Sequence, residues 1–91
     1  MKIMNELPGN VRATIMNKLE RRDLESIHMG HASPNENENE DFVVIARERG
    51  LETANCYSVY VYALDQDELG CYSDGLTYAD ALIRMGEYIN I

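Results

Sequence analysis

The chain is poor in the features on which membrane proteins, disulfide-linked proteins and metalloproteins depend. Its 91 residues include two cysteines, Cys56 and Cys71, which belong to neither a Cys-x-x-Cys motif nor a Cys/His cluster. No apolar run reaches the length of a membrane span, and the N-terminus lacks the apolar core of a signal peptide. We therefore expect one cytoplasmic domain without cofactor or metal, with two reduced thiols mostly buried near strand ends. A disulfide between the two cysteines is the alternative.

Basic residues are also scarce, and their distribution is uneven. Eight Lys and Arg stand against sixteen Asp and Glu, which gives a formal net charge of −8. Residues 1–24 carry five bases and three acids, whereas residues 25–91 carry three bases and thirteen acids. Nucleic-acid binding depends on cationic side chains that release counterions, so the second segment should repel nucleic acid. A negative field attracts basic proteins instead. The alternative is that the acidity only keeps the protein soluble.

A recognisable catalytic constellation is missing as well. His28 and His31 lie in a weakly patterned segment, without a Ser or Asp partner at a fixed spacing. The glycines before the last predicted helix lack the Lys and the spacing of a phosphate-binding loop. Asp65 opens an Asp-x-Asp run like that of a calcium loop, but the twelfth position is Leu76 and not the bidentate Glu. We therefore expect a protein that is not an enzyme.

The N-terminal part of the chain predicts a helix followed by a polar loop. Val11, Ile15 and Leu19 recur at i, i+4 and i+8, which places one apolar stripe on a helix over residues 10–22. The segment after this helix fits either a short strand or a frayed helix end. Residues 30–41 are rich in Asn and Glu, so we expect a flexible acidic loop there.

Two strands are predicted in the middle of the chain. Residues 42–46 form a β-branched run, and residues 57–64 alternate between two faces. We assign the Val-rich face of the second strand to the helix-covered core, which leaves Tyr60 and Tyr62 on the more open face. Packing beneath the N-terminal helix is the simplest alternative role for these tyrosines, and an interface for a partner is another.

The last part predicts a short strand or a glycine-bracketed turn, followed by a capped helix. Thr77 and Asp80 have the spacing of a capping box, in which the Thr hydroxyl accepts a hydrogen bond from a first-turn amide. The helix that follows has one predicted apolar stripe toward the core. Its members are Tyr78, Leu82, Met85 and Ile89, and the small Ala81 should allow the helix to approach the sheet closely.

Together these elements predict an α+β fold in a single domain, residues 1–91. It has an N-terminal helix, a small antiparallel β-sheet of about three strands, and a C-terminal helix packed on one face of the sheet. Consecutive strands joined by short loops favour a meander, with both helices on the same face.

The run from Phe42 to Ile89 resembles the small sheet-and-helix domain of HicB-type antitoxins. The resemblance rests on Asp67–Cys71, Ser73–Thr77 and Asp80–Leu82, which are similar to the family's Asp-Leu-Pro-Gly-Cys, Gly-x-Thr and Glu-Ala-Leu motifs. It implies a ββα unit over residues 42–89 and the capping of a small basic ribonuclease by an acidic surface. The family's proline is replaced here. No DNA-binding domain follows in this sequence, so we do not expect autoregulation of an operon.

These observations favour a small acidic, non-enzymatic inhibitor that blocks the nucleic-acid site of a basic nuclease or nucleoprotein. Within this class we expect either a HicB-like antitoxin or a phage-encoded anti-defence protein, such as an anti-CRISPR protein. The alternative is a structural or assembly module that homodimerises through a strand edge or the tyrosine face. In neither case do we expect direct contact with nucleic acid or a membrane. The predicted partner-binding residues are Asp65, Asp67, Glu68, Tyr72, Asp74, Tyr60 and Tyr62.

Overall fold

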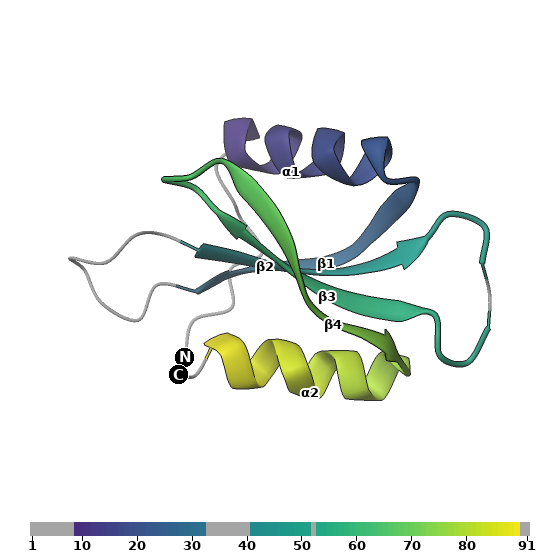
Figure 1. Cartoon of the computed structure of the whole chain (residues 1–91). Coiled ribbons are helices and arrows are strands. Elements are labelled where there is room, and N and C mark those ends of the chain that lie inside the picture. Colours follow the sequence, from purple (N-terminus) through teal and green to yellow (C-terminus); the bar gives the residue numbers. More distant parts are fainter. Residues whose placement is uncertain (1–8, 33–40, 52, 90–91) are drawn as a thin grey trace.

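A four-stranded antiparallel sheet lies between two helices (Figure 1). The structure, a computed structural model, describes residues 9–32, 41–51 and 53–89. Each strand pairs with the next one along the chain, so the sheet order is β1-β2-β3-β4 and the topology is a meander. The elements are α1 (Gly9–Arg21), β1 (Leu24–Ala32), β2 (Asp41–Glu48), β3 (Tyr57–Ala63), β4 (Glu68–Leu76) and α2 (Tyr78–Ile89).

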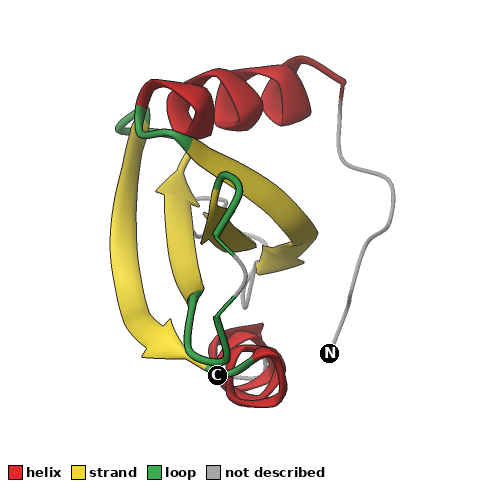
Figure 2. Ribbon diagram, turned by 90° about the vertical axis from the view of Figure 1, so that its right-hand side faces the viewer, coloured by secondary structure: helices red, strands yellow, loops and turns green. Residues whose placement is uncertain are grey.

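The predicted α+β class is confirmed, with a fourth strand in the sheet. The helices lie on opposite faces of the sheet and not on the same face, so the expectation of one helix-covered face is wrong (Figure 2). The sequence of strand β2 agrees with helices on both faces. Its residues Phe42 to Ala46 are all buried, without the alternation of a half-exposed strand. A continuous apolar run is typical of a strand that is covered on both faces.

Helix α1 covers one face of the sheet. Val11, Ile15 and Leu19 are buried as predicted, and they pack against Phe42 and Val44 among other residues of the sheet. The helix begins one residue before the predicted range and ends one residue before its predicted end. Among the described residues, no helix is long and apolar enough to cross a membrane.

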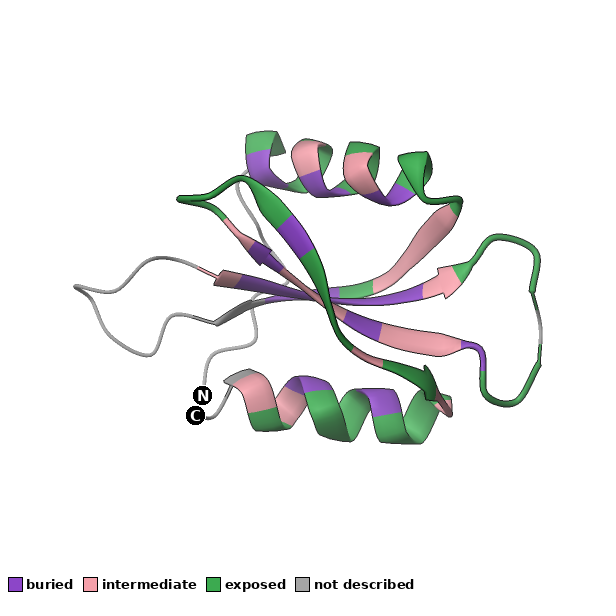
Figure 3. Ribbon diagram, in the orientation of Figure 1, coloured by how far each residue is buried: buried purple, intermediate pink, exposed green. Residues whose placement is uncertain are grey.

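Helix α2 covers the other face, through a stripe that shares Met85 with the predicted one but not Tyr78 or Leu82. Ala81 and Met85 are buried against β2 and β3, with Tyr88 beside them. Tyr78 and Leu82, which were predicted to face the core, are 40% and 42% exposed. The side chain of Ile89 lies outside the described residues. The small side chain of Ala81 allows a close contact between helix and sheet, so the side of α2 that carries Ala81 faces inward. The opposite side of α2 is exposed (Figure 3).

The predicted cap of α2 is present. The backbone N–H of Asp80 donates a hydrogen bond of 3.1 Å to the Thr77 hydroxyl. This bond satisfies one of the first-turn amides that have no partner within the helix.

Two strands were predicted only as alternatives, because their sequences interrupt the expected alternation, and the structure confirms the strand alternative for both. Strand β1 has an irregular register between Ser26 and His28, and it includes Gly30 from the predicted loop. Strand β4 replaces the predicted glycine-bracketed turn, and its pairing with β3 shifts register twice. The predicted ββα unit over residues 42–89 is therefore βββα. The remainder of the predicted loop, residues 33–40, lies outside the described residues.

Candidate functional site

The acids predicted as a single cluster lie at two places along β4. Asp65 and Asp67 lie in the turn between β3 and β4 and Glu68 begins β4, whereas Asp74 lies near the far end of the strand. Six residues of extended chain separate Glu68 from Asp74, which corresponds to about 20 Å. Both side chains are exposed, and neither forms an ion pair with any residue that the structure describes. The negative charge therefore follows the edge strand.

Asp67 has a structural partner on each side. It accepts a hydrogen bond of 2.5 Å from the Tyr62 hydroxyl, and its carboxylate lies 3.5 Å from Lys18 of α1. The hydrogen bond from Tyr62, with the nearby Lys18 charge, lowers the pKa of Asp67. The same bond, together with burial, raises the pKa of Tyr62 to about 12. The carboxylate of Asp67 is thus held by contacts within the protein. The exposed carboxylate that remains available to a partner at this end of β4 is that of Glu68.

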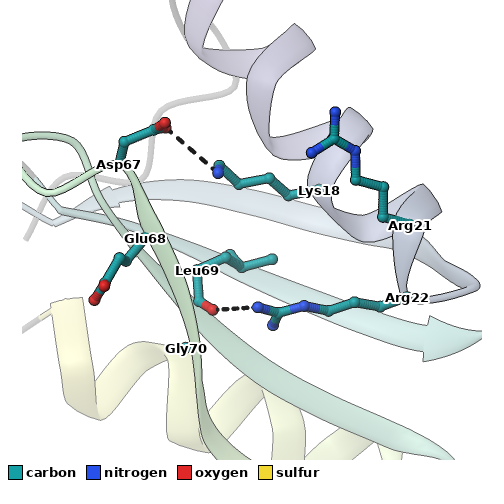
Figure 4. A pocket seen from close by; sticks show the side chains of 7 residues that line it. All are labelled: Lys18, Arg21, Arg22, Asp67, Glu68, Leu69 and Gly70. Carbon is teal, nitrogen blue, oxygen red and sulfur yellow. Dashed lines mark hydrogen bonds and ion pairs between the residues drawn. The ribbon is translucent and has the colours of Figure 1, made fainter.

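A cavity of about 450 Å³ opens between the end of α1 and the start of β4 (Figure 4). Lys18 of α1 faces Asp67 of the turn across it, whereas Glu68 points away from the cations. Arg22 also donates a hydrogen bond of 2.8 Å to the backbone carbonyl of Leu69. Because charges of both signs line the cavity, it is not a purely acidic surface. Its lining residues are Lys18, Arg21, Arg22, Asp67, Glu68, Leu69 and Gly70.

Tyr60 and Tyr62 lie beneath α1 and not on an open face. Tyr62 is 2% exposed, and Tyr60 packs against the same core cluster. The guanidinium of Arg22 lies 5.6 Å from the centre of the Tyr60 ring, a cation–π distance. Burial, together with the neighbouring Cys71, raises the pKa of Tyr60. The packing alternative is therefore confirmed for both tyrosines, and the assignment to the open face is wrong.

Tyr72 is the one predicted aromatic contact that remains accessible. It projects from β4 and packs edge-on against Tyr88 of α2, with ring centres 5.2 Å apart. Tyr88 in turn donates a hydrogen bond of 2.7 Å to Asp41. Tyr72 thus lies on the α2 side of the strand, whereas Tyr60 and Tyr62 lie on the α1 side.

The two thiols differ from each other. Cys56 is buried as predicted, but the expected burial of Cys71 is wrong, because it is exposed within β4; both thiols are free, so the disulfide alternative is wrong as well. Burial of the sulfur and the nearby Asp74 raise the pKa of the Cys71 thiol. A raised pKa suppresses the thiolate, so this position does not have the chemistry of a reactive cysteine.

Sequence reasoning missed a polar and aromatic cluster at the start of α2. Arg47 lies 2.5 Å from Glu25 and 5.7 Å from the centre of the Tyr57 ring. Tyr57 packs against Tyr78, whose hydroxyl lies 2.5 Å from His28 Nε2. These residues come from three strands and one helix, so no local motif could have revealed them. Their contacts hold the first turn of α2 on the sheet.

The described residues contain no group of three or more His, Cys, Asp and Glu side chains arranged to hold a metal ion. His28 is engaged by Tyr78, and the side chain of His31 lies outside the described residues.

Comparisons with protein-family models, with curated proteins and with solved structures found no match to this chain.

Proposed function

We propose that this chain is a non-enzymatic inhibitor that binds a basic protein and blocks its nucleic-acid site. The observation that supports this function best is the line of acids along the exposed edge strand. Glu68 and Asp74 carry charges that no described cation neutralises, and Asp65 lies in the adjoining turn.

Carboxylates at both ends of an exposed strand carry the same sign of charge as the phosphates of a nucleic acid. Cationic grooves that bind phosphates therefore attract such a strand, and the attraction speeds encounter at low ionic strength. Glu68 and Asp74 are the central contacts in this proposal. Tyr72 lies between them in the sequence and adds an aromatic contact of the kind that is enriched in interfaces.

Asp67 has a supporting role here. Its carboxylate already interacts with Tyr62 and Lys18, so its substitution should affect the conformation of the turn more than the affinity for a partner. Tyr60 and Tyr62 are covered by α1, and they position β3 and the turn without touching the partner.

The identity of the partner separates the two versions of the inhibitor. A small basic ribonuclease corresponds to a HicB-like antitoxin, and a large nucleic-acid-guided complex corresponds to a phage anti-defence protein. Both act in the cytoplasm, where we expect this chain to work.

A pull-down from nuclease-treated host lysate, at low and at high salt, tests the proposal. We expect one dominant basic protein that is released by salt and whose nucleic-acid binding is lost when the purified chain is added. A captured protein that keeps its nucleic-acid binding at saturating concentrations of the chain would contradict inhibition.

The second candidate function is a homodimerising assembly module. The observation in its favour is that β4 is an edge strand of nine residues, because exposed edges can pair with a second chain. However, Arg22 already occupies the Leu69 carbonyl, and Glu68 and Asp74 place like charges on that edge. Such charges are a common protection against edge pairing, so this function ranks second.

A further inference from the structure

Helix α2 has a second apolar side that faces away from the sheet. Ile83 is 57% exposed, the highest value among the large apolar residues that the structure describes, and Leu82 is 42% exposed. The inward side of the helix is already formed by Ala81 and Met85. A helix that is apolar on both sides is typical of one that is covered on both sides.

The outer residues form one continuous stripe. Ala79, Leu82, Ile83 and Gly86 follow the i, i+3, i+4, i+7 spacing of a single helix face. The small residues lie at the two ends of this stripe, and the large ones lie at its centre. A Cβ atom built on Gly86 would meet nothing within 4 Å, so the space above it is open. A second helix could therefore pack across the large residues at the centre, with room for its side chains over the small residues at the ends.

Acidic residues flank this stripe on one side. Asp80 and Glu87 stand three residues before and four residues after Ile83, which makes both of them its neighbours on the helix surface. Arg84 lies 3.1 Å from Glu87, but both side chains are half exposed, and such pairs contribute little. The surface thus combines an apolar centre with an acidic rim.

The acidic rim argues against a second copy of this chain as the occupant. If two α2 helices packed antiparallel about a twofold axis at Ile83, Asp80 of one copy would lie near Glu87 of the other. Like charges at this position would oppose the pairing. A helix with an apolar stripe and flanking Lys or Arg residues would instead satisfy both the centre and the rim.

We infer that the outer side of α2 is a docking surface for a cationic amphipathic helix of a partner protein. Leu82 and Ile83 form its apolar centre, and Asp80 and Glu87 form its charged rim. This surface is separate from the acids along β4, and the inference stands whether or not those acids bind a basic protein.

A synthetic amphipathic helix of Leu and Lys is a direct probe, used with the full chain labelled with ¹⁵N. We expect saturable binding, with the largest amide shifts in residues 79–87. Replacement of both Leu82→Ser and Ile83→Ser should weaken binding by about tenfold or more, because two apolar side chains are lost from the contact. The matched control is Met16→Ser, an exposed apolar residue on α1, which should leave the affinity unchanged.

A second pair of variants tests the rim without changing the apolar centre. Asp80→Asn with Glu87→Gln should weaken binding severalfold and reduce its salt dependence. Shifts that centre on the β3–β4 turn, or equal affinity for the wild type and the Leu82→Ser/Ile83→Ser variant, would overturn the inference. Concentration-dependent shifts in residues 79–87 without any peptide would also overturn it, because they would assign this surface to a second copy.

Discussion

At the scale of single residues, Asp67 accepts a hydrogen bond from Tyr62 and lies near Lys18. Its carboxylate therefore stabilises the fold. Its backbone has a positive φ of 51°, a conformation that Asp and Asn tolerate better than most residues do. The turn therefore requires this side chain for both its conformation and its hydrogen bond. Glu68, the next residue, has neither constraint.

The Tyr62 hydroxyl provides a first test at this scale. The variant Tyr62→Phe keeps the buried ring but removes the hydrogen bond to Asp67, so the free energy of unfolding should fall by about 1–2 kcal/mol. Urea denaturation followed by circular dichroism measures this change. The control variant Tyr72→Phe alters an exposed ring and should be close to neutral. Equal effects of the two variants would show that the bond to Asp67 adds no stability.

The Asp67 carboxylate predicts a pH dependence. The hydrogen bond from Tyr62 and the Lys18 charge lower its folded-state pKa, so the carboxylate stabilises the fold above its ordinary pKa. That contribution is lost as the pH falls through the lowered folded-state value. The variant Asp67→Asn should therefore be less stable than the wild type at pH 7, and the difference should shrink below about pH 4. Urea denaturation over this pH range measures it, and a difference that stays constant would contradict the assignment.

At the scale of elements, those with a regular pattern could be predicted and those with an interrupted pattern could not. The stripe of Val11, Ile15 and Leu19 predicts α1 closely, and the apolar run at Phe42 predicts β2. Strand β4 contains glycines and two register shifts, so its alternation does not appear in the sequence. The face of α2 was misjudged because Leu82 is the larger side chain, whereas the sheet accepts the small Ala81 at close range.

The orientation of α2 can be tested with two alanines of the same helix. Ala81 is fully buried against the sheet, so Ala81→Leu should overpack the contact and cost about 1–3 kcal/mol. Ala79 lies on the outer side, and Ala79→Leu should change stability by less than about 0.5 kcal/mol. Thermal unfolding of both variants compares them directly. The predicted stripe, with Leu82 inward, would give no such contrast.

Two glycines should respond to alanine with opposite signs. Gly86 lies inside α2 with open space around its Cβ position, so Gly86→Ala should stabilise the protein by about 0.5–1 kcal/mol. Gly75 has a φ of +65° near the end of β4, where an L-residue is strained, and Gly75→Ala should cost about 1 kcal/mol. Chemical denaturation measures both changes. Destabilisation by Gly86→Ala would mean that this side of the helix is not open.

At the scale of the whole molecule, the basic and acidic segments of the sequence lie on different parts of the structure. The bases of α1 lie over one face of the sheet, and the acids follow the β4 edge from the turn to α2. The sequence could predict an acidic second segment from composition alone. It could not predict that Lys18 neutralises Asp67, or that α1 covers Tyr60 and Tyr62, because these contacts join distant parts of the chain.

Charge reversal on β4 tests whether this edge binds a basic partner. The variant Glu68→Lys/Asp74→Lys should lose the salt-sensitive capture of that partner and its inhibition, and should keep the circular dichroism spectrum of the wild type. The control variant Glu20→Lys/Glu48→Lys changes the net charge equally at exposed positions outside β4. We expect this control variant still to bind the partner. Retained capture and inhibition by the β4 variant, or equal loss in both variants, would contradict it.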